Sequence, residues 1–182
     1  LSQQKKIPAF LGNKISTEID NFKPSLYSVF MNYTGVLGYY NPFSTEAQYN
    51  SHLPHTYLPF TLSHESAHQL GFAREQEANF VGYLVGIGSE NPELRYSTEY
   101  FALKSLLKAL VTEDEDFVKT VIEQYSGGMK RDYQAEKDFV EEYQEPMNTF
   151  IAFTNDLFLK TNQQEGAVTY SYFVDLLVRY ER

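Results

Sequence analysis

Cysteine is absent from the sequence. The chain therefore forms no disulfide bond and offers neither a thiolate metal ligand nor a cysteine nucleophile. Tryptophan is also absent, whereas tyrosine and phenylalanine are abundant, with 15 and 14 residues. We expect these rings to pack the core and to line a pocket, with many of the tyrosine hydroxyls needing a partner.

Basic residues are scarce relative to acidic ones. The chain has 15 Lys and Arg against 24 Asp and Glu, which gives a formal net charge of -9 and an isoelectric point near 4.9. Such a chain repels the phosphates of nucleic acids and the surface of an anionic membrane. We therefore expect no nucleic acid partner.

Long apolar runs are missing too. No stretch approaches the roughly 18 consecutive apolar residues of a membrane-spanning helix, and no secretory signal opens the chain. We expect these residues to be soluble as they stand. Because the chain begins with Leu1 and not with methionine, we also expect an upstream segment, which could hold a membrane anchor.

The composition is that of a globular protein, with 42% hydrophobic and 21% charged residues among 182. This length fits one domain, and we predict a single domain over residues 1–182. The patterning predicts a mostly α fold of the α+β class, with a small β-hairpin as its only β region. The hairpin strands are predicted at Val36–Tyr40 and Ala47–Asn50, on either side of a Pro/Ser/Thr cluster.

Helical spacing and capping signals predict most of the remaining elements. Thr61 or Ser63 is expected to cap the helix that follows it, and a capping box opens at Thr112. Gly127 and Gly128 are expected to break the chain. Residues 26–33 fit either a helical turn or a strand. The predicted helices cover residues 15–22, 64 to about 70, about 74–87, 92–111, 115 to about 125, 130–145 with a bend or restart at Pro146, and a last segment after Gly166.

The residues His64-Glu-Ser-Ala-His68 form an H-E-x-x-H motif. Two histidines four residues apart on a helix lie on the same face, one turn above each other, and can bind one metal ion. Glu65 is rotated about 100° from His64, so it can reach a water at the metal without being a ligand. The motif predicts one zinc ion per chain, with Glu65 as general base.

A catalytic zinc needs a third protein ligand, and the residues after the motif offer two carboxylates. Arginine cannot ligate, so Arg74 excludes a third histidine at that position, as in the metzincin subclass. Glu75 shares a helix face with Ala78 and Asn79, and the small Ala78 would allow close approach to the motif helix. We predict Glu75 as the third ligand, with Glu77 as the alternative.

The block Glu75-x-x-Ala78-Asn79 resembles the helix that supplies the glutamate ligand in gluzincin-type metallopeptidases. Most of the chain resembles an uncharacterised bacterial family of membrane-anchored, zincin-like proteins. The resemblance implies a zincin-like helical domain with a small sheet beside the motif helix, preceded by membrane helices and lying outside the cytoplasm, at the cell envelope. It is carried by residues 38–43, 58–73, 77–80, 95–97 and 174–177. In this chain the glutamate follows the second histidine after a much shorter gap than in well-studied gluzincins.

The residues predict a zinc-dependent metallopeptidase with a peptide or protein substrate. Any contact with a membrane is expected only through the missing N-terminal segment. The hairpin is either a structural edge or a strand that borders the cleft and pairs with an extended substrate. Two alternatives remain for the whole chain, namely a catalytically inactive, zinc-stabilised scaffold at the cell envelope and a helical domain without metal.

Overall fold

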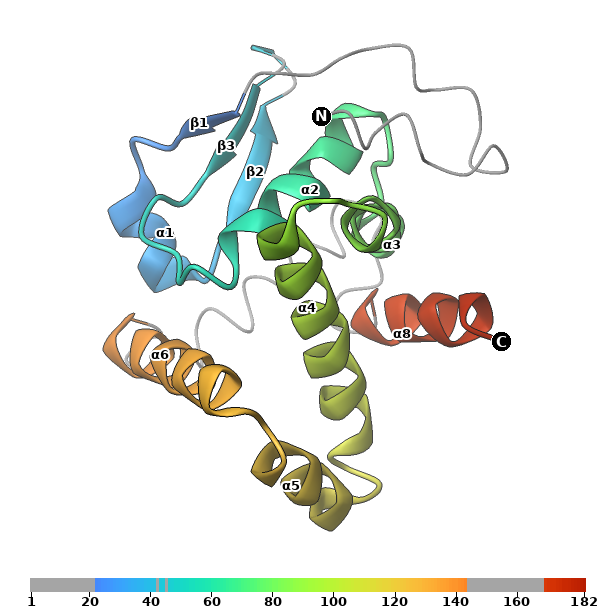
Figure 1. The fold of residues 1–182 in the computed structure, drawn as a ribbon. Coiled ribbons are helices and arrows are strands. Elements are labelled where there is room, and N and C mark those ends of the chain that lie inside the picture. The colour runs from blue at the N-terminus through green and yellow to red at the C-terminus, as the bar shows by residue number, and fades with distance from the viewer. Residues whose placement is uncertain (1–21, 42, 45, 144–168) are drawn as a thin grey trace.

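The computed structural model describes residues 22–41, 43–44, 46–143 and 169–182. The predicted helix over 15–22 and the predicted restart at Pro146 therefore lie outside the described residues, except for Phe22. The described residues are mostly helical, with a small mixed sheet at one end (Figure 1). This arrangement confirms the predicted α+β class.

The sheet consists of three short strands, β1 (Phe22–Pro24), β2 (Gly38–Asn41) and β3 (Glu46–Tyr49), in the order β1-β3-β2. Strands β2 and β3 pair antiparallel, which confirms the predicted hairpin. Strand β1 pairs parallel to β3 and was not predicted. The prediction that the hairpin is the only β region is therefore wrong.

The remaining described elements are helices, and the predicted helices that fall within the described residues are confirmed. The segment over 26–33, left open between helix and strand, contains a short helix. Asn91 caps the longest of the described helices by accepting hydrogen bonds from the backbone N–H groups of Glu93 and Leu94. The described helices are α1 (Ser28–Thr34), α2 (Leu58–Gln69), α3 (Glu75–Ile87), α4 (Pro92–Leu110), α5 (Glu115–Glu123), α6 (Gly127–Tyr143) and α8 (Thr169–Tyr180).

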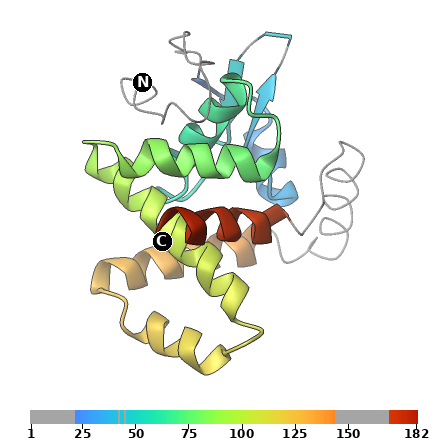
Figure 2. The ribbon, with the colours of Figure 1, turned by 90° about the vertical axis from the view of Figure 1, so that its right-hand side faces the viewer.

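Helix α3 lies at the centre of the packing. One of its faces meets α2 in an apolar cluster that includes Ala67, Ala78 and Val81. Another face meets α4 and α8 in a second cluster, where Phe173 is fully buried. Figures 1 and 2 show α8 lying across α4 and below α3. The helix that follows the motif helix is thereby held from both sides.

Among the described residues, no helix is both long enough and apolar enough to cross a membrane. The longest helix, α4, carries charged residues along its length.

A glycine sets the distance between α3 and α4. A Cβ atom at Gly86 would lie 1.9 Å from the Oγ1 atom of the fully buried Thr98. Substitution of Gly86 by alanine is therefore expected to lower the free energy of unfolding by about 1–3 kcal/mol or more, because β-branched Thr98 cannot rotate away freely. Urea denaturation measures the change. Gly88→Ala is the matched control, since its Cβ would only touch a carbonyl oxygen at 3.4 Å, and an equal loss in both variants would contradict the packing argument.

Candidate metal centre

The motif residues lie on α2. This helix begins at Leu58, about one turn earlier than predicted, so the predicted caps Thr61 and Ser63 lie inside it and are buried. Pro59 occupies the first turn, where a missing N–H group costs nothing. Inside the helix, the Ser63 hydroxyl instead donates to the carbonyl oxygen of Gly82 on α3 at 3.0 Å. This hydrogen bond therefore links the N-terminal part of the motif helix to α3.

Gly71 ends the motif helix, as predicted. Its φ of 95° is a left-handed conformation that favours glycine. The backbone N–H of Gly71 donates to the carbonyl of His68 at 2.9 Å, and that of Phe72 donates to Ala67 at 3.1 Å. This tight reversal returns the chain to α2, so that α3 starts at Glu75 beside the motif.

The structure brings His64, His68 and Glu75 together into a group that could hold a metal ion. The two Nε2 atoms of the histidines lie 3.1 Å apart. The carboxylate oxygens of Glu75 lie 3.3 Å from the Nε2 atom of His64 and 3.5 Å from that of His68. The three side chains thus converge on one point from two helices.

These distances fit one zinc ion. Four ligands about 2.0–2.1 Å from zinc at tetrahedral angles lie about 3.3–3.4 Å from each other. The observed separations of 3.1, 3.3 and 3.5 Å between His64, His68 and Glu75 bracket this value. Two imidazoles and one carboxylate are also a donor set that zinc accepts, and a fourth position remains for water.

The ring of His68 is oriented by the backbone. Its Nδ1 atom lies 2.8 Å from the carbonyl oxygen of Phe72. A carbonyl only accepts hydrogen bonds, so Nδ1 is a donor. When the ring is neutral, its lone pair is therefore on Nε2, toward His64 and Glu75, and when the ring is protonated, Nε2 donates to Glu75. Ligand histidines in metal sites are commonly held in this way.

The charges in the group are strongly coupled. Burial alone would raise the pKa of Glu75, but hydrogen bonds from His64 and His68 outweigh it and hold the pKa of Glu75 well below its usual range. Burial would lower the pKa of His68, yet hydrogen bonding to Glu75 and the charges of Glu75 and Glu65 raise it above its usual value. Glu75 is thus kept ionised, which is the form that binds a metal.

Glu65 lies beside this group and is buried, with 4% of its surface exposed. Burial raises the pKa of its carboxyl, and its Oε2 atom has no hydrogen-bond partner among the described residues. A Cβ atom at Gly38 would lie only 2.7 Å from the Oε1 atom of Glu65, so the backbone of β2 covers this carboxylate. The side chain thus has one buried oxygen without a partner among the described residues.

The other residues considered from the sequence lie outside the group. Glu77 and Arg74 are exposed, and Glu77 is not among the grouped ligand atoms. The two remaining histidines of the sequence, His52 and His55, are exposed in the loop before α2, and the Nδ1 atom of His52 lies 3.2 Å from the amide nitrogen of Asn32. The assignment of Glu75 over Glu77 as ligand stays a prediction.

Sequence reasoning missed two parts of the site, Gly38 and the carbonyl of Phe72. Gly38 begins a strand whose contact with Glu65 spans 27 positions of the chain. The Phe72 carbonyl belongs to the backbone and leaves no trace in the residue type. Gly71 and the small Ala78 were local signals that the chain returns to α2.

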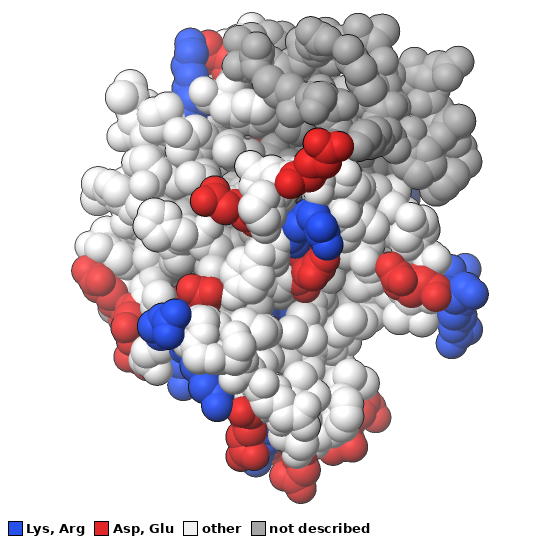
Figure 3. All heavy atoms as spheres, viewed as in Figure 1, with Lys and Arg blue, Asp and Glu red and all other residues white. Residues whose placement is uncertain are grey.

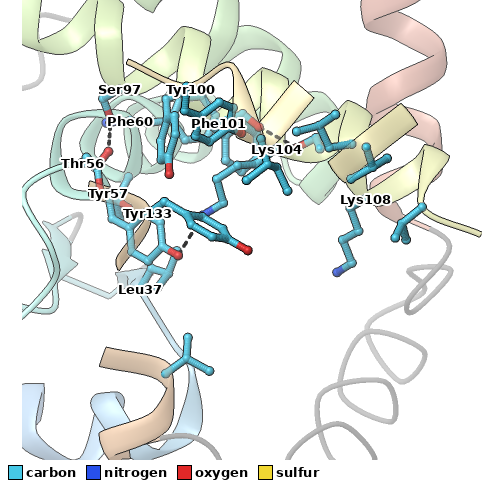
Figure 4. Close-up of a pocket in the computed structure, with 18 of the residues that line it drawn as sticks. Leu37, Thr56, Tyr57, Phe60, Ser97, Tyr100, Phe101, Lys104, Lys108 and Tyr133 are labelled. Atoms are coloured by element: carbon cyan, nitrogen blue, oxygen red, sulfur yellow. Dashed lines mark hydrogen bonds between the residues drawn. The ribbon is translucent and has the colours of Figure 1, made fainter. Parts of the chain in front are cut away.

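A separate cavity of about 560 Å³ lies between the start of α2 and helices α4, α5 and α6. Figure 4 shows Tyr57, Phe60, Tyr100 and Phe101 around it. Lys104 donates to Glu136 at 2.6 Å and to the hydroxyl of Tyr57 at 2.9 Å, which pairs the buried charge of Glu136. None of the predicted site residues lines this cavity.

A profile of the family described as "Protein of unknown function (DUF3810)" matches residues 3–178. The match includes the motif helix, the turn at Gly71 and the whole of α3. No curated protein and no solved structure matches the chain.

Proposed function

We propose that this chain, which belongs to the DUF3810 family, is a zinc-dependent metallopeptidase. The proposal rests on one observation above all. The two Nε2 atoms and the carboxylate oxygens of Glu75 are separated as the ligands of a tetrahedral zinc ion would be. Glu75 places one carboxylate oxygen near each imidazole, so each of the three residues can offer a ligand atom to the same ion.

His64, His68 and Glu75 would hold the ion. When bound, zinc lowers the pKa of water toward 7 and polarises a carbonyl oxygen. Glu65 would take a proton from the attacking water and pass it to the leaving amine. The raised pKa of Glu65 fits a group that has to carry a proton between these two steps, and its Oε2 atom has no hydrogen-bond partner among the described residues.

The position of β2 supports an extended peptide as substrate. Within the described residues β2 pairs only with β3, so its other edge offers backbone hydrogen bonds. The same strand contacts Glu65 through Gly38. A peptide that adds to this edge would run past the proposed base, which is the functional alternative considered for the hairpin.

The location of the protein is part of the proposal. The resemblance to membrane-anchored zincin-like proteins supports a domain outside the cytoplasm, at the cell envelope, held there by a preceding membrane segment. No described helix supplies such a segment.

The test is peptide-library profiling with the purified chain. We expect cleavage products at neutral pH, their loss after treatment with a chelator, and their return when zinc is restored. Mass spectrometry of the digested library measures all three. Cleavage that persists in the chelated protein would show a different mechanism.

The profiling also separates the proposal from the alternative of a zinc-stabilised scaffold. A scaffold would bind one zinc ion per chain and become less stable on chelation, but it would cleave no member of a broad library or of a denatured protein mixture. That outcome would leave the metal site in place and remove the peptidase assignment.

A further inference from the structure

Helix α1 buries polar residues and exposes apolar ones. Its inward face holds Ser28 and Asn32, both buried, with Met31 between them. Leu26 and Tyr27, directly before the helix, and Val29 and Phe30 within it point outward. Leu26 is 97% exposed and the other three are 61–67% exposed. An ordinary surface helix turns its apolar stripe to the core and its polar residues to water.

The polar inner face is fixed by hydrogen bonds. The hydroxyl of Ser28 donates to the carbonyl of Ser25 at 2.6 Å and accepts from the backbone N–H of Ser51 at 3.1 Å. The side-chain amide of Asn50 donates to Oδ1 of Asn32 at 2.7 Å. Because these buried groups are satisfied only in this orientation, the helix cannot rotate to bury its apolar face.

The chain on either side of α1 is uncharged. Between Lys23 and Glu46 the sequence contains no charged residue, and these two side chains pair with each other. Figure 3, in the view of Figure 1, shows the left-hand surface over α1 without basic or acidic side chains, and Figures 1 and 2 both place α1 at the periphery. Although the whole chain has a net charge of -9, the surface over α1 is neutral and apolar.

We infer that Leu26, Tyr27, Val29 and Phe30 form an insertion patch for the interfacial region of an uncharged or zwitterionic lipid bilayer. The helix turns its polar residues to the protein and its apolar residues outward, which is the distribution expected of a helix whose outer face contacts lipid. The tyrosine ring, with its polar hydroxyl, is favoured at the boundary between headgroups and acyl chains, and the phenylalanine and aliphatic side chains supply the apolar face that enters the acyl region. The patch needs no anionic lipid, which the acidic chain would repel. This inference does not depend on the proposed peptidase activity.

The area of the insertion patch argues against a second copy of the chain as its partner. Four side chains of about 200 Å² each, exposed to these fractions, offer roughly 600 Å². A stable protein interface needs about 800 Å² from each partner, with a flat or complementary surface. The patch is nevertheless at the upper end of what a monomer exposes without a function.

The lack of tryptophan allows a direct test. Phe30→Trp places the only tryptophan of the chain in the insertion patch. We expect its fluorescence emission to shift to the blue when phosphatidylcholine vesicles are added to the full chain. Phe117→Trp, at a half-exposed position on α5 away from α1 in both views, is the matched control and is expected not to shift.

A second pair of variants tests the energetics. Leu26→Ser combined with Phe30→Ser is expected to lower the vesicle partition coefficient roughly tenfold or more, with thermal unfolding unchanged because both side chains are exposed. Vesicle flotation measures the partition. The inference is overturned if Phe30→Trp shows no shift, if both tryptophan variants shift alike, or if the shift follows protein concentration without vesicles, as in self-association.

Discussion

Replacement of Glu65 by glutamine is expected to slow peptide hydrolysis by roughly 10²- to 10⁴-fold while zinc stays bound. Glutamine has the same shape and keeps the contact with Gly38, but its amide cannot accept a proton from water. The ligands His64, His68 and Glu75 are unchanged. Initial rates on the best peptide of the library and the zinc content of the same sample measure the two effects separately.

The matched control for Glu65→Gln is Glu77→Gln, which removes the same negative charge from an exposed position on the neighbouring helix. It is expected to keep both zinc and activity. If Glu65→Gln cleaved as fast as the parent, Glu65 would not be the general base. Loss of zinc in Glu65→Gln would instead point to a structural role of the buried carboxylate.

The end of the motif helix and the start of α4 could be predicted because their signals are local. Gly71 marks the left-handed turn, and Asn91 followed by Pro92 marks the start of α4, in each case within a few residues of the element it bounds. The relative position of His64 and His68 follows from helix geometry alone. The sequence alone therefore predicts which face of the motif helix carries the two histidines.

Elements that depend on distant partners could not be predicted in the same way. Strand β1 has only three residues and exists because Phe22 pairs with Ala47, 25 positions later in the chain. Such a pairing leaves no periodic pattern.

Besides the cap at Thr61 or Ser63, two local predictions failed because competing signals lay close together. Asp114, not Thr112, caps α5 by accepting from the N–H of Phe117 at 2.9 Å. Gly127 and Gly128, expected to break the chain, form the first turn of α6, after Ser126 whose hydroxyl accepts from the N–H of Met129. Aspartate and serine are both favoured N-cap residues. At the start of α6, the serine cap outweighs the poor helix propensity of the two glycines in the first turn.

The face of α3 was the decisive inference for the third ligand, and the fold gives its physical basis. Ala78 is fully buried in the cluster between α2 and α3, as its small size suggested. Gly82 also lies against α2, where a Cβ atom would approach the backbone of His64 at 3.2 Å. With Ala78 and Gly82 against α2, Glu75 on the same side points toward the histidines, whereas Glu77 is exposed.

Zinc binding should therefore distinguish the two carboxylates sharply. The wild type is expected to bind one zinc ion per chain, and Glu75→Ala is expected to lower the affinity at least about 100-fold, more than the loss of an outer-shell partner. Glu77→Ala should bind as the wild type does. Competition with a chromophoric chelator gives the affinities, and elemental analysis gives the stoichiometry.

Thermal unfolding supplies an independent readout of the same difference. Zinc at about 100 times its dissociation constant adds about 2.7 kcal/mol to the stability of a protein that binds it only when folded. For a domain of this size that corresponds to a rise in Tm of roughly 5–10 °C. Glu77→Ala should keep this rise and Glu75→Ala should lose it. The reverse pattern would identify Glu77 as the ligand and require a rotation of α3, whereas no rise in any variant, wild type included, would remove the zinc site and the peptidase proposal together.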